Sequence, residues 1–215
     1  MNKTIATRIV TCLVALAALT LILGASCNST SGPSGNPSQG TGQSTNAVVL
    51  TNAVLVTPSI PVWCWAAATS EVLNFYGSTN STQCQLVSLV DHNDTVSCCP
   101  TNTNCVLVPT PPSLQLLILD PRASQIRVTA TYTNAPLDFG QVQTQINNGN
   151  PIMVLYQGSD TSGHFAVIYG YDPSSQYVYI HDPLNPLAVA FVVPFGSTFN
   201  YNGQLVWAST FTFSH

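Results

Sequence analysis

The stretch Trp63-Cys64-Trp65-Ala66-Ala67-Ala68-Thr69-Ser70-Glu71-Val72-Leu73-Asn74-Phe75-Tyr76-Gly77 decides the fold of this chain. Its apolar side chains recur at the spacing of a helix with one buried face. Gly77 favours a helix end there, because glycine adopts the left-handed conformation without steric cost. Pro58 and Pro61 break regular structure just upstream. We therefore expect a helix that begins at or next to Cys64.

A position at the start of a helix affects the reactivity of Cys64. A thiolate, not a thiol, attacks a carbonyl, and the positive end of a helix lowers the pKa of a thiol. A nearby imidazolium does the same and can later protonate a leaving amine. Cys64 is therefore a candidate nucleophile, although a buried cysteine in an apolar helix is more often a small core residue.

Among the histidines, His164 is the best candidate for the base. It precedes an apolar stretch that indicates a strand, and a second predicted strand follows after a short turn. Simple hairpin register pairs positions equidistant from the turn, which places His164 near Asp182 and Pro183. An aspartate there can accept a hydrogen bond from one imidazole nitrogen and orient the ring. The plainer alternatives are a structural histidine and a turn aspartate.

The other three histidines receive plainer interpretations. His181 would face the opposite side of its strand from Asp182, on a tyrosine-rich, partly exposed face. His92 lies in a polar loop with nearby aspartates, where surface exposure is the default and a metal site is a distant second. His215 ends the sequence, and we expect it to be disordered.

The remaining elements predict an α+β fold, with a helical N-terminal part and an antiparallel sheet in the C-terminal part. The further helices are expected at Thr82–Val90, Ser113–Leu119 and Ala135–Asn148. The strands are expected at Ala47–Val56 (an edge strand or extended arm), Ile126–Tyr132, Pro151–Gln157, Phe165–Tyr171, Gln176–His181, Ala188–Val193 and Leu205–Phe213.

Four cysteines, Cys84, Cys98, Cys99 and Cys105, lie close together in sequence. In an exported protein such a cluster indicates two disulfides. Adjacent Cys98 and Cys99 do not easily pair with each other, so each is expected to pair with Cys84 or Cys105; the connectivity stays open. A zinc site is the rival interpretation, and the spacing matches it poorly. This count leaves Cys64 without an assigned disulfide partner.

The N-terminal region indicates export. Residues 1–26 carry two positive residues and then an apolar run, as in a signal peptide. Cys27 follows small residues and is a lipidation candidate; simple signal cleavage is the alternative. Residues 27–47 then form a polar segment rich in Ser, Gly and Asn, with the composition of a flexible tether. Residues 48–215 remain as one domain, exported and held at the membrane only by the lipid anchor, or else secreted.

Composition excludes some functions. Only 6% of the residues are charged, against about 25% in a typical protein. The formal net charge is -4, and Arg122 and Arg127 are the basic residues outside the signal. Nucleic-acid binding needs a cluster of Lys and Arg, so we expect no nucleic-acid partner. Electrostatic attachment to an anionic membrane is excluded for the same reason.

Three segments in order resemble papain-like cysteine peptidases, closest to the bacterial branch of effector proteases and bacteriocin-leader peptidases. Residues 63–67, followed by the helix to Gly77, are similar to the nucleophile helix of that family. Residues 163–172 are similar to its histidine strand and residues 178–183 to its aspartate strand. The resemblance covers roughly Val56 to Val193, and three motifs in order are more specific than one.

The resemblance implies a papain-like fold and peptide-bond hydrolysis, with Cys64 as nucleophile, His164 as base and acid, and Asp182 as orienting group. It implies a peptide or protein substrate and no cofactor, and we expect a monomer. The family's oxyanion-stabilising Gln is missing upstream of Cys64. The Cys64 backbone N–H is then the oxyanion donor, with Ser59 as an additional candidate.

That departure keeps other functions open. The first is a weak or inactive peptidase fold that binds peptides at a surface lipoprotein. The others are a structural surface lipoprotein, and a peptidoglycan amidase or transpeptidase that uses the same thiol chemistry.

Overall fold

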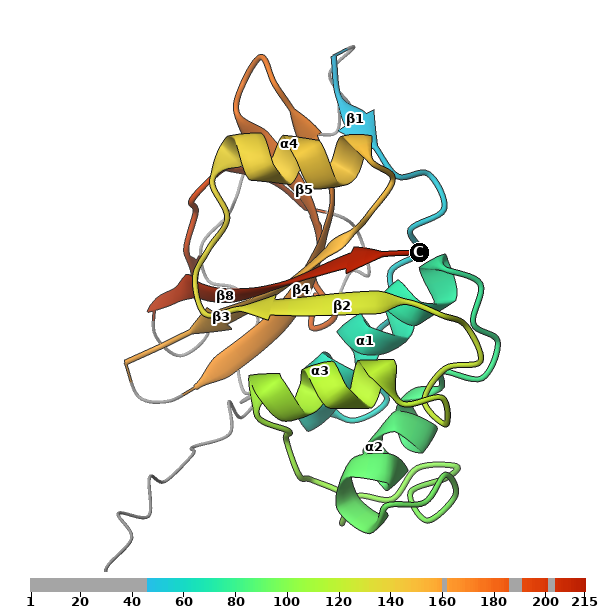
Figure 1. The fold of residues 1–215 in the computed structure, drawn as a ribbon. Coiled ribbons are helices and arrows are strands. Elements are labelled where there is room, and N and C mark those ends of the chain that lie inside the picture. Colours follow the sequence, from blue (N-terminus) through green and yellow to red (C-terminus); the bar gives the residue numbers. More distant parts are fainter. Residues whose placement is uncertain (1–45, 160–161, 186–190, 201–203) are drawn as a thin grey trace, which may run out of the picture.

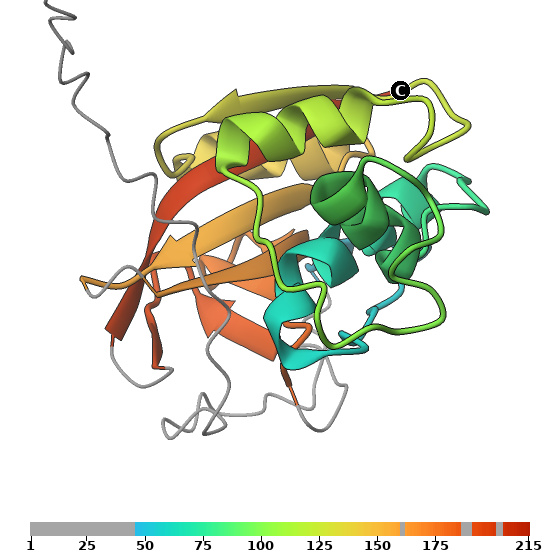
Figure 2. The same ribbon diagram turned by 90° about the horizontal axis from the view of Figure 1, so that it is seen from below.

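The computed structural model describes residues 46–159, 162–185, 191–200 and 204–215. The expected signal peptide and Cys27 lie outside these residues. One antiparallel sheet lies at the centre, with helices on both of its faces (Figures 1 and 2). The predicted α+β class is confirmed.

Each helix begins at a sequence signal. The helix α1 (Cys64–Phe75) follows a short 3-10 turn at Pro61–Trp63. The helix α2 (Gln83–His92) begins after Thr82 and α4 (Phe139–Asn147) after Asp138, both with a capping box. The helix α3 (Pro111–Leu119) begins with prolines, which suit the first turn of a helix because their missing N–H has no partner there.

The sheet has eight strands in the order β2-β8-β3-β4-β5-β6, with β1 beside β4 and β7 beside β8. Every described pairing is antiparallel. The strands are β1 (Val48–Val49), β2 (Thr129–Thr133), β3 (Ile152–Gln157), β4 (Gly163–Asp172), β5 (Tyr177–His181), β6 (Phe191–Pro194), β7 (Phe199–Asn200) and β8 (Gln204–Ser214).

The two faces of the sheet bury two separate cores. Successive strand residues point to opposite faces, and along β3 Met153 and Leu155 belong to one core cluster while Ile152 and Val154 belong to the other. The first cluster includes residues of α1, α2 and α3, and the second includes residues of α4. The views in Figures 1 and 2 accordingly show α1, α2 and α3 together on one side of the sheet.

Two disulfides tie the loop after α2 to that helix and to itself. Cys84 pairs with Cys99, and Cys98 pairs with Cys105. The indole of Trp63 donates a 2.8 Å hydrogen bond to the carbonyl of Cys105, so the loop also holds the residue that precedes α1. The prediction of two disulfides agrees with the structure, which also supplies the connectivity that the sequence left open.

The sequence placed several element boundaries differently from the structure. The strand expected from Ile126 begins at Thr129, and the helix expected from Ala135 begins at Phe139, because Asp138 caps it. The arm expected at Ala47–Val56 is a strand only at Val48–Val49. This arm passes close to β4: a Cβ on Gly170 would lie 2.6 Å from Val49 Cγ1, so glycine is needed there.

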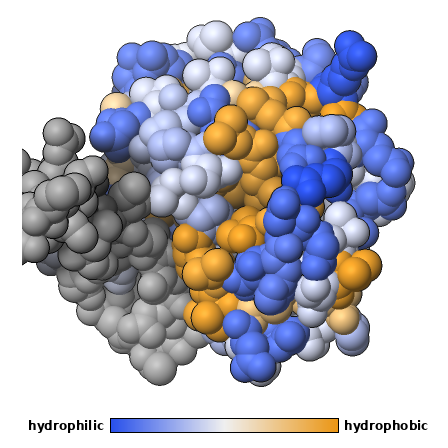
Figure 3. Space-filling model, turned by 60° about the horizontal axis from the view of Figure 1, so that its bottom comes forward, coloured by the Kyte–Doolittle hydropathy of each residue, from blue (hydrophilic) through white to orange (hydrophobic). Residues whose placement is uncertain are grey.

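Among the described residues, no helix combines the length and apolar character that crossing a membrane requires. The molecular surface seen from the helical side carries apolar bands between hydrophilic areas (Figure 3). Leu116, at 71% exposure, and Leu107, at 54%, are among the exposed large apolar residues.

Candidate active site

Cys64 is the first residue of α1, as the sequence predicted. Its backbone N–H lies at the positive end of a 12-residue helix, where a developing negative charge is stabilised. The side chain is fully buried and belongs to the same core cluster as Phe165, the residue that follows His164 on β4. Helix α1 packs against β4, so the nucleophile candidate and the histidine strand are neighbouring elements.

His164 and Asp182 meet at one end of the β4–β5 hairpin. His164 is the second residue of β4, and Asp182 directly follows β5. Their side chains are joined by a 2.7 Å hydrogen bond between Nε2 and Oδ1, and both are buried. The sequence placed these residues near each other by simple register; the actual register pairs Val167 with His181 and contains an irregularity between Ile168 and Gly170.

The Asp182 carboxylate is held by more than the histidine. Its Oδ1 also accepts a 2.9 Å hydrogen bond from the backbone N–H of Leu184. Two donors on one oxygen fix the orientation of the carboxylate. The orientation of the aspartate therefore does not depend on the imidazole alone.

Aromatic residues surround this pair. Tyr156 lies opposite His164 in the β3–β4 register, and its ring is 4.4 Å from that of Phe199. The Phe199 ring is 6.5 Å from the ring of His164. Burial raises the pKa of the Tyr156 hydroxyl, and the negative charge of Asp182 raises it further. A hydrogen bond in such an apolar setting is weakly screened by water, which strengthens it.

One expectation about Cys64 needs correction. The cysteine count left Cys64 without a disulfide partner, whereas its sulfur is disulfide-bonded in the structure. A disulfide sulfur cannot be the attacking thiolate, because nucleophilic attack needs the free S⁻ form. Any reaction at Cys64 must therefore start from the reduced protein.

The segment before α1 is held by a residue that the sequence analysis did not single out. Gln83, the first residue of α2, donates from its side-chain nitrogen to the Thr57 carbonyl and accepts from the Ser59 backbone N–H, at 2.7 and 2.8 Å. Ser59, the additional oxyanion candidate, is exposed and bound through its backbone to this glutamine. The Gln83 amide thus holds the segment before α1 in place, and one of its two N–H donors is taken by the Thr57 carbonyl.

A second histidine–carboxylate pair was also missed. His181 Nδ1 lies 2.6 Å from Glu71 Oε1, with side-chain exposures of 8% and 1%. The expectation of a partly exposed His181 is wrong, because its ring is buried between Glu71 of α1 and the ring of Tyr169 on β4. A signal was present in the sequence: Glu71 is the only charged residue in the α1 sequence, seven positions after Cys64.

The remaining histidines have local partners. His92 is exposed and ends α2, and its Nε2 lies 3.7 Å from Cys105 Sγ. The ligand atoms of His92, Cys98 and Cys105 lie within 4.8 Å of one another, but the two sulfurs form one disulfide and do not offer thiolates to a metal. The ring of His215, expected to be disordered, stacks on Tyr76 at 5.7 Å.

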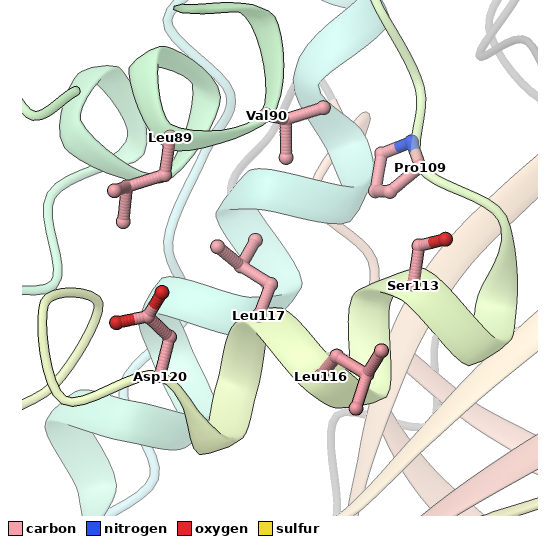
Figure 4. Close-up of a pocket in the computed structure, with 7 residues that line it drawn as sticks. All are labelled: Leu89, Val90, Pro109, Ser113, Leu116, Leu117 and Asp120. Atoms are coloured by element: carbon pink, nitrogen blue, oxygen red, sulfur yellow. The ribbon is translucent and has the colours of Figure 1, made fainter. Parts of the chain in front are cut away.

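A surface hollow of about 350 Å³ lies between α2 and α3 (Figure 4). Figure 4 shows Leu89 and Val90 on one side and Leu116 and Leu117 on the other. The hollow contains none of the three candidate catalytic residues. The Asp120 carboxylate at its edge is paired with Arg122 at 2.7 Å. This hollow is therefore separate from the candidate active site.

Comparison with known proteins places this chain in a family. The model of the Peptidase_C39 like family matches residues 43–200, which include Cys64, His164 and Asp182. No curated protein matches the chain. Among solved structures, the chain is similar to xylellain, a cysteine protease from Xylella fastidiosa. The identity is 13%, the match covers 79% of this chain and 85% of that chain, and the TM-score is 0.48.

Proposed function

Because this chain belongs to the Peptidase_C39 like family and is a cysteine-type peptidase, we propose that it hydrolyses peptide bonds through Cys64, His164 and Asp182. The observation that carries the proposal is the buried 2.7 Å bond between His164 and Asp182, on the strand against which the cysteine-bearing helix packs. A nucleophile, a base and a group that orients the base are the three parts that acyl transfer needs.

We infer the roles of the two His164 ring nitrogens from the bond to Asp182. The carboxylate accepts from Nε2, so the neutral ring carries its proton there and offers the lone pair of Nδ1. Nδ1 then takes the proton of the reduced Cys64 thiol. The imidazolium that forms is stabilised by the negative charge of Asp182.

The thiolate sulfur attacks the carbonyl carbon of the scissile peptide, and the carbonyl oxygen becomes an oxyanion. His164 gives its Nδ1 proton to the leaving amine, and the C–N bond breaks to leave a thioester on Cys64. Water, deprotonated by His164, then attacks the thioester and releases the acid product with the thiol restored. Protons and charges balance over the cycle, so no cofactor is needed.

The oxyanion of this mechanism needs hydrogen-bond donors. The backbone N–H of Cys64 at the start of α1 is one donor. Ser59 is exposed, and Gln83 holds its backbone. Loss of a single oxyanion donor costs roughly a hundredfold or more in rate. We therefore expect a slow peptidase, and peptide binding without turnover is the outcome that would replace this function.

The test is hydrolysis of a mixed fluorogenic peptide library by the reduced protein. Cys64→Ser keeps the size of the side chain but removes the thiol, and we expect activity to fall about 10⁴-fold or more. Ser70→Ala, on the same helix, is the matched control and should keep activity close to wild type. Peptide binding without cleavage by the wild-type protein would indicate a binding module. Cleavage of peptidoglycan amides alone would indicate an amidase.

We further propose that the protein is exported and anchored through a lipid on Cys27, and that it acts as a monomer at the cell surface or in the periplasm. Two disulfides support an oxidising compartment, because the cytosol keeps most thiols reduced. Mass spectrometry of the membrane-extracted protein should find an acylated N-terminal peptide at Cys27. An unmodified N-terminus that begins elsewhere would show simple cleavage and secretion.

A further inference from the structure

We propose that Glu71 and His181 form a positioning pair, which locks the nucleophile helix α1 against strand β5 so that Cys64 meets His164. This inference rests on the proposed function, since it concerns how the same site is assembled. The two residues are buried and bonded to each other, so they act on catalysis through the elements that carry them.

The bond joins the two elements at short range. The distance between His181 Nδ1 and Glu71 Oε1 is 2.6 Å, and the residues are 110 positions apart in sequence. A hydrogen bond to a carboxylate in a buried setting is directional and is strengthened by the low local dielectric. It therefore fixes a distance and an orientation that apolar packing alone leaves less sharply defined.

On α1, the position of Glu71 relates directly to the nucleophile. It lies seven residues after Cys64, which on a helix is nearly two full turns, so the two residues share a face about 10 Å apart along the axis. A helix held at Glu71 on that face cannot rotate about its axis without breaking the bond. Rotation of α1 is the motion that would turn Cys64 away from the sheet.

On β5, the position of His181 relates directly to the orienting aspartate. His181 is the last residue of the strand and Asp182 follows it. Neighbouring residues point to opposite sides of an extended chain: His181 reaches Glu71, while Asp182 reaches His164. One dipeptide thus binds the nucleophile helix on one side and the catalytic histidine on the other.

Two more contacts hold the pair in place. The second Glu71 oxygen, Oε2, accepts from the Val56 backbone N–H at 3.4 Å, which adds the arm before α1 to the assembly. On the other side of His181, the ring of Tyr169 on β4 stacks at 4.0 Å. Four segments of the chain, namely α1, β5, β4 and the arm before α1, therefore contact this buried pair. One hydrogen-bond partner would be enough to satisfy a single buried polar group.

The experiment measures how iodoacetamide alkylation of Cys64 depends on pH in the mildly reduced full chain, and compares the wild type with variants of Glu71 and His181. In the wild type, the thiolate should persist to low pH because His164 and the helix end stabilise it. Glu71→Ala is expected to lose this low-pH reactivity and about a hundredfold in kcat, as misplacement by about 1 Å does. Glu71→Gln keeps an acceptor for His181 and should restore both readouts to near wild type.

Two variants keep the test decisive if Glu71→Ala does not fold. Glu71→Leu with His181→Leu leaves no unpaired buried charge, so it should fold, yet we expect it to lose thiol activation. Ser70→Ala removes a different buried bond of α1, to the Ser81 carbonyl, and should leave the alkylation profile unchanged.

The outcomes separate the two proposals. A double leucine variant with the wild-type alkylation profile would overturn the positioning role while leaving the peptidase intact. A wild-type Cys64 that reacts like an ordinary thiol would overturn the proposed function, and the positioning role with it.

Discussion

Asp182 Oδ1 accepts hydrogen bonds from two donors, the His164 ring at 2.7 Å and the backbone of Leu184 at 2.9 Å. The backbone donor holds the carboxylate in place independently of the histidine. The orientation of the imidazole therefore follows from the fold of the turn after β5, and it does not depend on a bound substrate.

The first prediction concerns this pair. Asp182→Asn keeps the shape of the side chain but removes its charge, and the amide can present a donor to Nε2, which favours the wrong ring tautomer. We expect kcat to fall about 10²- to 10⁴-fold with little change in KM. Steady-state kinetics on the reduced protein would measure this.

A second aspartate of the same hairpin provides the control. Asp172, at the other end of β4, accepts from the Ser174 backbone and the Ser175 hydroxyl in the turn. Asp172→Asn should lower stability somewhat but leave kcat near wild type. Equal losses in both variants would show that Asp182 acts only on the fold.

The second prediction concerns the two disulfides of the loop after α2. A bridge of sequence separation 15, Cys84–Cys99, restricts the unfolded chain more than one of separation 7, Cys98–Cys105. Replacing both cysteines of a bridge by serine should lower the free energy of unfolding by about 2–4 kcal/mol. Urea unfolding without reductant would measure the loss, and non-reducing peptide mapping should find these two pairings. If the replacements changed neither the stability nor the structure, the assignment of these disulfides would be contradicted.

The third prediction concerns pH and Glu71. Burial raises the pKa of this carboxyl above 4.5, against the opposing hydrogen bond and charge of His181 and the bond from Val56. The folded state therefore holds this proton more tightly than the unfolded state. The resulting stability is present below pH 4.5 and is lost as the pH rises through the folded-state pKa. Glu71→Gln does not titrate, so its unfolding free energy should lack this loss.

Urea unfolding of wild type and Glu71→Gln from pH 4 to 8 tests the sign. The wild type should lose stability relative to the variant with rising pH; parallel curves would contradict the account.

Asp94 gives a contrast of opposite sign, because hydrogen bonds from Ser97 and Val96 lower its pKa from 3.8 to about 2. Its contribution is present above pH 3.8 and is lost as the pH falls toward 2, and Asp94→Asn should remove it.

Much of this architecture could be predicted from local signals in the sequence. The helix at Cys64 followed from apolar spacing and from Gly77, whose φ of +91° is the left-handed conformation expected there. The proximity of His164 to Asp182 followed from counting residues on either side of a turn. Both inferences work because they depend on short stretches of chain.

The parts that escaped prediction depend on distant contacts. No local pattern pairs Glu71 with His181, which meet only because α1 covers one face of the sheet. Alternation along β5 assigned His181 correctly to the side opposite Asp182, but it could not tell that a helix covers that side. The connectivity of four clustered cysteines likewise depends on the path of a loop.

The central claim is that Cys64 is a thiol activated by His164. The most direct test is labelling of the mildly reduced protein with an epoxide reagent for papain-like thiols, located by mass spectrometry. The account predicts modification at Cys64 that disappears in His164→Ala and persists in Ser70→Ala. A folded, reduced protein with an unmodified Cys64 would contradict it.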